Sequence, residues 1–293
     1  MVAKTLKALL NAGEFIAAPG VFDLLSAKIA DRTDAKALYM TGFGTAVSYL
    51  GYRDARLASD TDMLNRASII AQAVKKPLIA DGDSGCGSLL TVHHTVRGYE
   101  RAGVAMIQLE DQQTPKKYEH TPARHIVSIK EMVSKIRVAS DSRSSRDFLI
   151  MARTDARTSD GFDEALRRAE LYAQAGADAI FIEGMESIEE MTKIGSALDV
   201  PLVANQTHGG HTPILPQARL MEIGFSVAIY PTAGLFAAAK ALAEVYVAHV
   251  SDSAVEAPIS GIGDFADMMG FHDHWNFERK YTDLLEIETG ARA

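Results

Sequence analysis

Residues 78–83 read LIADGD, a short apolar run that ends in two carboxylates. The same construction recurs along the chain, where a polar or charged residue directly follows an apolar run. Short apolar runs are typical of buried parallel strands. In a (β/α)8 barrel the carboxyl ends of all strands open onto one face, which carries the chemistry. Five successive runs would therefore bring polar groups to one place, namely Asp81-Gly82-Asp83 after 78–80, Glu110-Asp111 after 105–109, Arg153 after 148–152, Glu183 after 179–182 and Asn205 after 202–204.

The alternation of strands with helices predicts the fold class. Residues 162–173 carry apolar residues at helical spacing, and Ser187 followed by Glu190 resembles the capping box that begins a helix. Gly103 and Gly176 stand where helices should end before the next strand. Repeated along the chain, this alternation predicts an α/β fold, a (β/α)8 TIM-type barrel. The predicted strands are about 15–18, 37–41, 77–81, 105–110, 148–153, 179–183, 201–205 and 226–230.

The chain continues beyond the last predicted strand. Residues 232–250 read as an apolar, alanine-rich helix, so we place the catalytic barrel domain at 1–250 and a C-terminal helical extension at 251–293. The extension should hold a loop and then further helix. Its apolar residues need a surface to cover, either their own barrel or that of a neighbouring subunit. They are Phe265, Met268, Met269, Phe271, Trp275, Phe277, Tyr281, Leu284 and Leu285.

The composition limits the class of protein. The 293 residues are 47% apolar, which suits one barrel with additions, and the single cysteine, Cys86, excludes an intrachain disulfide. The formal net charge of −8 argues against nucleic acid or an anionic membrane surface as the partner. It permits a small anionic substrate, because local cations can reverse the field inside a pocket. Residues 1–7 lack the apolar core of a signal peptide and no apolar stretch is expected to reach membrane-spanning length, so we expect a cytoplasmic protein.

Residues 81–88, DGDSGCGS, form an acidic loop that is interrupted by glycines. Hard cations such as Mg²⁺ prefer oxygen ligands and keep several waters. Asp81 and Asp83, together with Glu110 from the next strand, suit such a cation. The alternative is a turn whose aspartates cap a helix that begins near Ser88. The second acidic group on the adjoining strand favours the metal site.

Two further segments indicate an anion site. A hydroxyl followed by glycines, as in Thr41-Gly42-Phe43-Gly44, can hold a carboxylate or an oxyanion with the backbone N–H groups there, although an ordinary turn between strand and helix would look the same. Arg153 is hard to bury without an anion, and its planar fork suits a carboxylate. The alternative for Arg153 is a buried salt bridge to Glu183 or Asp83, and both interpretations can hold at once.

Eight segments of the chain together resemble the isocitrate lyase/phosphoenolpyruvate mutase superfamily, over roughly residues 15–285. Within it, the chain looks most like 2-methylisocitrate lyases, 2,3-dimethylmalate lyases and carboxyphosphonoenolpyruvate mutases. The segments that carry the resemblance are YMTG at 39–42, LGYRD at 50–54, DGDSG at 81–85, QLEDQ at 108–112, PKK at 115–117, ARTDA at 152–156, EGM at 183–185 and AN at 204–205.

This resemblance implies a cofactor and a set of site residues. Mg²⁺, for which Mn²⁺ could substitute, would be held directly or through water by Asp81, Asp83 and Glu110, with Asp54 nearby. The substrate's carboxylate would lie against Tyr39, Thr41, Gly42 and Arg153, and Glu183 and Asn205 would complete the pocket. The loop from about 112 to 125 would close over the substrate. Members of the superfamily act next to an enolpyruvate-type oxyanion. The resemblance also implies a homodimer or homotetramer that exchanges its C-terminal helices.

The chain departs from the superfamily's lyases at the predicted gate. Those lyases carry a Lys-Lys/Arg-Cys-Gly-His motif whose cysteine is the general acid, whereas residues 116–120 here read KKYEH. Tyr118 replaces the cysteine, and the unperturbed pKa of tyrosine is about 10 against about 8.5 for cysteine. The proton donor would therefore be Tyr118, Glu119 or His120. Lys116 and Lys117 favour a multiply anionic substrate, although a solvated pair of lysines is the alternative.

Two smaller departures concern His208 and Cys86. Relatives usually have glutamate at the position of His208, which is either a hydrogen-bond partner behind the site or a group that contacts the substrate. Cys86 stands where relatives usually have an aromatic residue, and a small apolar filler is the simpler interpretation of it.

The leading hypothesis is an Mg²⁺-dependent carbon–carbon lyase. Its substrate would be a branched 2-hydroxy di- or tricarboxylate like 2-methylisocitrate or dimethylmalate, cleaved through an enolate of a 2-oxo acid. The alternatives are a phosphonopyruvate-type mutase or hydrolase, an oxaloacetate decarboxylase, and a carboxylate-binding homologue without catalysis. The retained carboxylates and Arg153 argue against the last.

Overall fold

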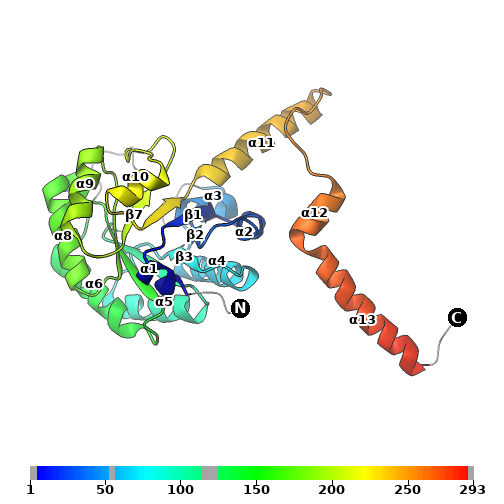
Figure 1. Ribbon diagram of the computed structural model, residues 1–293, viewed down its shortest axis with the longest axis horizontal. Helices are drawn as coiled ribbons and strands as arrows, with labels where there is room; N and C mark the ends of the chain where they lie inside the picture. Colours follow the sequence, from blue (N-terminus) through cyan, green and yellow to red (C-terminus); the bar gives the residue numbers. More distant parts are fainter. Residues whose placement is uncertain (1–4, 53–56, 114–124, 290–293) are drawn as a thin grey trace. The chain divides into compact units, whose positions relative to one another are not determined.

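A computed structural model describes residues 5–52, 57–113 and 125–289 of the chain. Strands β1 to β8 form a closed, all-parallel barrel in chain order (Figure 1). The predicted (β/α)8 architecture is therefore confirmed, and each predicted strand overlaps an observed one. The strands are β1 (Ile16–Val21), β2 (Leu38–Met40), β3 (Leu78–Asp81), β4 (Met106–Glu110), β5 (Leu149–Thr154), β6 (Ala179–Ile182), β7 (Leu202–Asn205) and β8 (Val227–Tyr230).

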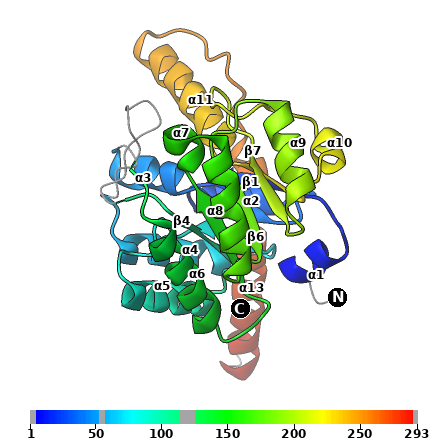
Figure 2. The same ribbon diagram turned by 90° about the vertical axis from the view of Figure 1, so that its left-hand side faces the viewer.

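Helices surround the strands and connect one to the next (Figure 2). By their contacts the residues divide into two units, Met1–Ala237 and Ala238–Ala293, and helix α11 spans the division. The helices that begin in the first unit are α1 (Leu6–Asn11), α2 (Leu24–Asp31), α3 (Gly42–Leu50), α4 (Asp60–Ala73), α5 (Leu89–Arg101), α6 (Ile129–Ser142), α7 (Ala156–Asp160), α8 (Phe162–Gln174), α9 (Ile188–Ala197), α10 (Gln217–Glu222) and α11 (Ala233–Val250).

Side chains alternate along each strand between two apolar layers. Met106 and Leu149 belong to a cluster inside the barrel, which two buried leucines of α1 also join. Their neighbours in sequence, Ile107 and Ile150, belong to the cluster between the strands and the helices. Every second residue of a strand therefore points to the barrel axis. At the carboxyl ends of the strands this same alternation leads from apolar residues to the polar ones.

The ends of the helices follow the sequence signals with one exception. Gly103 and Gly176 have φ of 88° and 107°, the left-handed conformation that ends a helix before the next strand. Ser187 caps α9 by accepting a hydrogen bond from the Glu190 N–H at 3.1 Å. The Glu190 side chain does not complete a capping box with Ser187, because its carboxylate pairs with Arg157 at 2.8 Å. Helix α9 is thus tied to α7 instead.

The second unit holds most of α11 together with α12 (Ile262–Met269) and α13 (Phe271–Thr289), which contact each other. Among the described residues α11 alone is long and apolar enough to cross a membrane, with a mean hydropathy of 1.3 and 6% of its residues buried. The expectation that no apolar stretch reaches that length is therefore wrong. Tyr246 and Val250 are exposed on this helix. The domain boundary at residue 250 and the exchange of helices stay predictions.

Gly195 gives a test of how α9 packs. A Cβ at this position would overlap the carbonyl oxygen of Ile223, which is backbone and cannot turn away. Alanine normally stabilises a helix relative to glycine by about 0.5–1 kcal/mol. Here we expect Gly195→Ala to lower the free energy of unfolding by about 1–3 kcal/mol, because overpacking outweighs helix propensity. Urea unfolding at a fixed protein concentration measures the change.

Ser196→Ala is the matched control, since Ser196 is the exposed neighbour of Gly195 on the same helix. It should leave the unfolding midpoint almost unchanged. An increase in stability for Gly195→Ala would show that α9 does not approach Ile223 so closely.

Candidate active site

Five predicted residues meet at the carboxyl ends of neighbouring strands. Asp81 ends β3, Glu110 ends β4, Arg153 is the last residue but one of β5, Glu183 follows β6 and Asn205 ends β7. Four of them lie two residues beyond a member of the inner apolar cluster, and Glu110 lies four residues beyond its member Met106, so the alternation of the strands points all five toward the barrel axis. Glu110 is 1% exposed and Asp81 and Glu183 are each 4% exposed. The structure thus assembles a buried, mostly acidic group at the barrel mouth.

Arg153 is surrounded by carboxylates. Its Nε and Nη2 donate to the two carboxylate oxygens of Asp155 at 3.0 and 2.9 Å, a bidentate pair. Glu110 and Glu183 lie 3.5 and 3.4 Å from the same guanidinium, whose carbon is 5.0 Å from the centre of the Phe181 ring. Burial lowers the pKa of Arg153, but these carboxylates outweigh burial and hold the pKa well above its usual value. The sequence offered Glu183 as a partner and missed Asp155.

Asp81 is held in a fixed orientation. Its Oδ1 accepts hydrogen bonds from the Asp83 N–H at 2.9 Å and from Gln108 Nε2 at 3.2 Å. Its other oxygen lies against Gly42, where an added Cβ would displace the carboxylate. Asp83 has a φ of 48°, a left-handed conformation that is uncommon for aspartate. The alternative role as helix caps does not apply to α5, because Ser88 caps that helix.

Gln108 is a site residue that the sequence analysis missed. It is fully buried, accepts a hydrogen bond from the Tyr39 hydroxyl at 2.9 Å and donates to Asp81. Tyr39 therefore reaches the acidic group through an amide. The available signal was a polar residue inside the apolar run of β4, at a position that alternation points to the barrel axis. Tyr99 supports the same place, since its hydroxyl donates to the Asp81 carbonyl at 3.0 Å.

Thr41 caps helix α3, and its hydroxyl accepts a hydrogen bond from the Gly44 N–H at 3.2 Å. Its side chain thus does what an ordinary turn between strand and helix requires. The N–H of Gly42 begins the helix and has no acceptor within it. An oxyanion role for this segment would therefore fall to the backbone beside Asp81, not to the hydroxyl.

The buried charges bear on the predicted cation. Three of the five carboxylates here, Glu110, Asp155 and Glu183, lie within 3.5 Å of the Arg153 guanidinium, and all five are at most 7% exposed, so the buried negative charge exceeds the charge of that arginine. Burial of unbalanced charge is costly, and a divalent cation would balance it. The donors are all oxygen, as Mg²⁺ prefers, and Mg²⁺ keeps several waters as ligands. The residues therefore fit a hydrated Mg²⁺ in charge and ligand type. They are Asp81, Asp83, Glu110, Asp155 and Glu183.

The described side chains do not by themselves form a coordination shell for the predicted Mg²⁺. Within 5–52, 57–113 and 125–289, no three His, Cys, Asp or Glu side chains are arranged to hold a metal ion. The predicted ligand Asp54 lies outside the described residues. A cation held here would accordingly depend on water, on substrate or on Asp54.

The remaining predicted residues are not brought into this group. His208 is exposed on the loop that follows β7 and has no hydrogen bond or ion pair with the described residues. Lys117, Tyr118, Glu119 and His120 lie outside the described residues. The chain on either side of them is fixed, because the Gln113 N–H donates to the His125 carbonyl at 2.8 Å.

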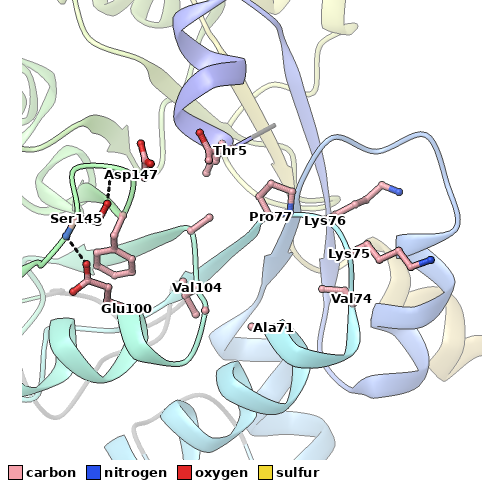
Figure 3. A pocket seen from close by; sticks show the side chains of 14 residues that line it. Thr5, Ala71, Val74, Lys75, Lys76, Pro77, Glu100, Val104, Ser145 and Asp147 are labelled. Carbon is pink, nitrogen blue, oxygen red and sulfur yellow. Dashed lines mark hydrogen bonds between the residues drawn. The ribbon is translucent and has the colours of Figure 1, made fainter. Parts of the chain in front are cut away.

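A pocket of about 410 Å³ lies at the opposite end of the barrel (Figure 3). It is lined by residues before β3, β4 and β5, including Pro77, Val104 and Phe148. In Figure 3 the Glu100 carboxylate is engaged by the Ser145 backbone, and no predicted site residue lines the pocket. Because the chemistry of such barrels lies at the carboxyl ends of the strands, we assign this pocket no catalytic role.

The chain is similar to a known enzyme family over most of its length. The family model described as phosphoenolpyruvate phosphomutase matches residues 6–250. The 2,3-dimethylmalate lyase of Eubacterium barkeri is 44% identical over 282 residues, which cover 95% of this chain and 98% of that relative.

Solved structures agree with this similarity. An oxaloacetate acetylhydrolase in complex with the inhibitor 3,3-difluorooxalacetate has a TM-score of 0.88 at 35% identity and covers 99% of this chain and 98% of its own. A phosphonopyruvate hydrolase in complex with oxalate and Mg²⁺ has a TM-score of 0.85 at 30% identity and covers 94% and 98%. The barrel and the helices after it are thus both included in the similarity.

The pair formed by Tyr39 and Gln108 can be tested by a double-mutant cycle. Tyr39→Phe leaves a buried amide oxygen without its donor, and Gln108→Leu leaves a buried hydroxyl without its acceptor. We expect each to lower the free energy of unfolding by about 1–3 kcal/mol and the two effects to be coupled by about 1 kcal/mol. Urea unfolding of the four proteins measures this coupling.

Tyr281→Phe, at an exposed tyrosine, controls for loss of a hydroxyl as such. Strict additivity of Tyr39→Phe and Gln108→Leu would contradict the hydrogen bond between them.

Proposed function

The chain belongs to the phosphoenolpyruvate phosphomutase family, within the isocitrate lyase/phosphoenolpyruvate mutase superfamily, and on that premise we propose that it is a Mg²⁺-dependent carbon–carbon lyase. The resemblance found in the sequence is thereby confirmed at the level of the family. The proposed substrate is a branched 2-hydroxy di- or tricarboxylate, of the dimethylmalate or 2-methylisocitrate kind. The observation that carries the proposal is a permanently charged Arg153 beside Glu110 and Glu183, at the carboxyl ends of β4 and β6.

The substrate's carboxylate would bind to Arg153. The hydrogen bonds of this residue to the described chain use Nε and Nη2, which leaves Nη1 to face a ligand. The guanidinium group of arginine binds a planar carboxylate with two parallel hydrogen bonds, which the ammonium group of lysine cannot do. Asn205 lies beside it, since its Nδ2 donates to Glu183 at 3.1 Å. These residues would fix one end of the substrate in the barrel mouth.

Mg²⁺, or Mn²⁺ in its place, would lie near Asp81, Asp83 and Glu110 and would stabilise negative charge that develops on substrate oxygens. Gln108 and Tyr99 keep Asp81 in place for this purpose. A base takes the proton of the substrate hydroxyl, and the neighbouring carbon–carbon bond breaks. The hydroxyl carbon becomes the carbonyl of a 2-oxo acid. The electron pair passes to the other carbon, so the enolate formed in this direction is that of the second carboxylate and not that of the 2-oxo acid as the sequence analysis expected. That carbon then takes a proton.

The donor of that last proton is proposed to be Tyr118, Glu119 or His120, with Lys117 binding a second anionic group. The sequence supports this, because the single cysteine is not in the 116–120 segment. Cys86 lies on the loop between β3 and α5, where its sulfur accepts a hydrogen bond from Thr95 at 3.0 Å. The thiol of Cys86 is therefore not part of the predicted gate at 116–120.

Two related reactions are kept as second candidates because similar structures favour them. One is the breakdown of oxaloacetate, suggested by the similarity to an oxaloacetate acetylhydrolase, and includes its decarboxylation. The other is phosphorus–carbon chemistry on a phosphonopyruvate, suggested by the similarity to a phosphonopyruvate hydrolase. Decarboxylation of oxaloacetate needs only a metal ion and stabilisation of the enolate, so it does not depend on the cysteine that the gate lacks. A role in carboxylate binding without catalysis is the remaining alternative.

We also propose that the protein is a homodimer or homotetramer that exchanges its C-terminal helices. Support comes from α11, whose apolar residues Leu242, Tyr246, Val247 and Val250 are all exposed in a single chain. A large apolar face of this kind marks a surface that a partner covers. Cover by a second copy would also account for a helix of membrane-spanning length in a cytoplasmic enzyme.

An assay of 2-oxo acid release tests the proposed reaction. The panel is dimethylmalate, 2-methylisocitrate, isocitrate, citramalate, oxaloacetate and phosphonopyruvate, each with Mg²⁺ and with EDTA. We expect release from a branched hydroxy acid and at least a 10²-fold loss of activity with EDTA, because the acidic group cannot act on an anion alone. Added Mn²⁺ should restore activity after EDTA.

Release from only oxaloacetate or phosphonopyruvate would replace the proposal with one of the second candidates. Activity that survives EDTA would contradict the metal requirement. Tyr118→Phe separates catalysis from binding, since loss of turnover with unchanged ligand affinity would exclude a protein that only binds.

The assembly is tested at two exposed residues of α11. Val247→Asp and Val250→Asp place charges on the apolar face, so we expect the mass measured by light scattering to fall toward that of one chain. Glu244→Gln, an exposed change on the same helix, is the control and should leave the mass unchanged. A monomeric wild-type protein would contradict the proposed assembly.

A further inference from the structure

Asp155 stands at the start of helix α7 and does not cap it. Aspartate is among the preferred capping residues, because its carboxylate can accept the N–H groups of the first turn. The Asp155 side chain accepts no N–H group of α7, and Asp155 has φ −101° and ψ 9°, close to the sparsely populated bridge region. The carboxylate is directed to Arg153 instead. A local rule is broken here, as is typical of functional positions.

The pair with Asp155 determines how the Arg153 guanidinium is oriented. Both carboxylate oxygens accept hydrogen bonds from it, at 3.0 and 2.9 Å, whereas Glu110 and Glu183 lie further away at 3.5 and 3.4 Å. Two parallel hydrogen bonds hold a carboxylate and a guanidinium close to one plane. Asp155 therefore decides which edge of the guanidinium faces the barrel mouth.

Asp155 is itself held by Asp111, which is fully buried. The Asp155 N–H donates to Asp111 Oδ1 at 2.9 Å, and the Thr154 hydroxyl donates to Asp111 Oδ2 at 2.7 Å. These two bonds fix the backbone and the direction of the chain as it leaves β5. Any movement of Asp111 would move Asp155 and with it the fork of Arg153.

Helix α8 holds Asp111 from the outer layer of the fold. The Tyr172 hydroxyl donates to Asp111 Oδ2 at 2.8 Å, and Arg168 Nη1 donates to the same oxygen at 3.2 Å. The same Arg168 nitrogen also donates to the Val127 carbonyl at 2.9 Å, where the chain returns before α6. Because α8 packs on β5 and β6, the whole network rests on a rigid element of the barrel.

We propose that Asp155 is a positioning residue for Arg153, and that Asp111, Arg168 and Tyr172 fix Asp155 from the outside. The inference rests on the proposed function only in taking Arg153 as the group that binds a carboxylate. It extends that function from the residue that touches the ligand to the residues that aim it. The ligand class concerned is a small dicarboxylate.

A competing effect of the same carboxylate makes the test sharp. Asp155 carries negative charge next to the anion site, so charge alone predicts that its removal tightens anion binding. Orientation alone predicts that its removal weakens binding. Asp155→Asn removes the charge and one of the two equivalent acceptors. Asp155→Glu keeps the charge and shifts the fork by one methylene.

The experiment measures oxalate binding by calorimetry in the presence of Mg²⁺, for the full chain. We expect both Asp155→Asn and Asp155→Glu to weaken binding by about tenfold or more, because a small misplacement of a binding group is costly. Tighter binding by Asp155→Asn with unchanged binding by Asp155→Glu would overturn the proposal. So would a fall in the unfolding temperature of both variants without any change in the affinity of the folded protein.

The outer part of the network is tested on α8. Tyr172→Phe keeps the ring and removes one hydrogen bond to Asp111, so we expect oxalate binding to weaken by about twofold to fivefold, well short of the effect expected at Asp155. Arg167→Met is the matched control, because Arg167 neighbours Arg168 and shares Glu164 with it while being 59% exposed. If Arg167→Met and Tyr172→Phe changed the oxalate affinity equally, the proposed role of Tyr172 and Arg168 in fixing Asp111 would be overturned.

Oxalate binding and 2-oxo acid release separate this proposal from the proposed function. A protein that binds oxalate in the expected order of variants, yet releases no 2-oxo acid from the panel, supports the positioning role and contradicts the lyase. Release of a 2-oxo acid by the wild-type protein, together with an oxalate affinity that the Asp155 variants leave unchanged, supports the lyase and overturns the positioning role. Absence of oxalate binding by the wild-type protein would overturn it as well.

Discussion

Alternation of side chains along eight parallel strands is the constraint on which the site depends. In a closed barrel every second residue must point inward, and the inner cluster fills that space with apolar side chains such as Met106 and Phe181. At the carboxyl ends the same positions become Glu110 and Glu183. The acidic residues therefore occupy the same inward-pointing positions as the apolar core, at the carboxyl ends of the strands. Its geometry inherits the rigidity of the barrel, because each member is two residues from a packed one.

That inheritance explains how the fold tolerates so much buried negative charge. An unpaired buried carboxylate is costly, and two of those here accept hydrogen bonds from side chains of the barrel. Asp81 accepts a hydrogen bond from the amide of Gln108, and the Asp155 carboxylate accepts two from Arg153. Burial and the charge of Asp155 raise the pKa of Asp111, while its own hydrogen bonds lower it, so its ionisation depends on the surrounding donors. A bound cation would stabilise such a site, because its positive charge would offset the buried negative charge.

The sequence predicted the barrel and its polar mouth because both follow from local patterns. Apolar runs locate strands, and a polar residue directly after a run must lie at the strand's end. Gln108 and Asp155 were missed for a physical reason. Gln108 lies within a run, where only the register with β3 shows that it meets Asp81, and Asp155 matters only through a pair with Arg153 that sequence spacing does not specify. Glu190 likewise had a local cap available and pairs with Arg157 from another element.

The predicted gate changes what the proposed lyase can do with a proton. A phenol with a pKa of about 10 is almost fully protonated at neutral pH, as a thiol of about 8.5 also is, but it holds its proton more firmly. The carbon that receives the proton after cleavage is far more basic than either group, so a phenol at Tyr118 would still donate to it. The reverse condensation needs a proton removed from that carbon by the ionised group, which is scarcer for tyrosine. That scarcer phenolate is also the stronger base, and the equilibrium constant fixes the ratio of the forward and reverse rates, so a tyrosine in the gate would alter the speed of proton transfer in both directions, with binding and orientation left to the barrel mouth and Arg153.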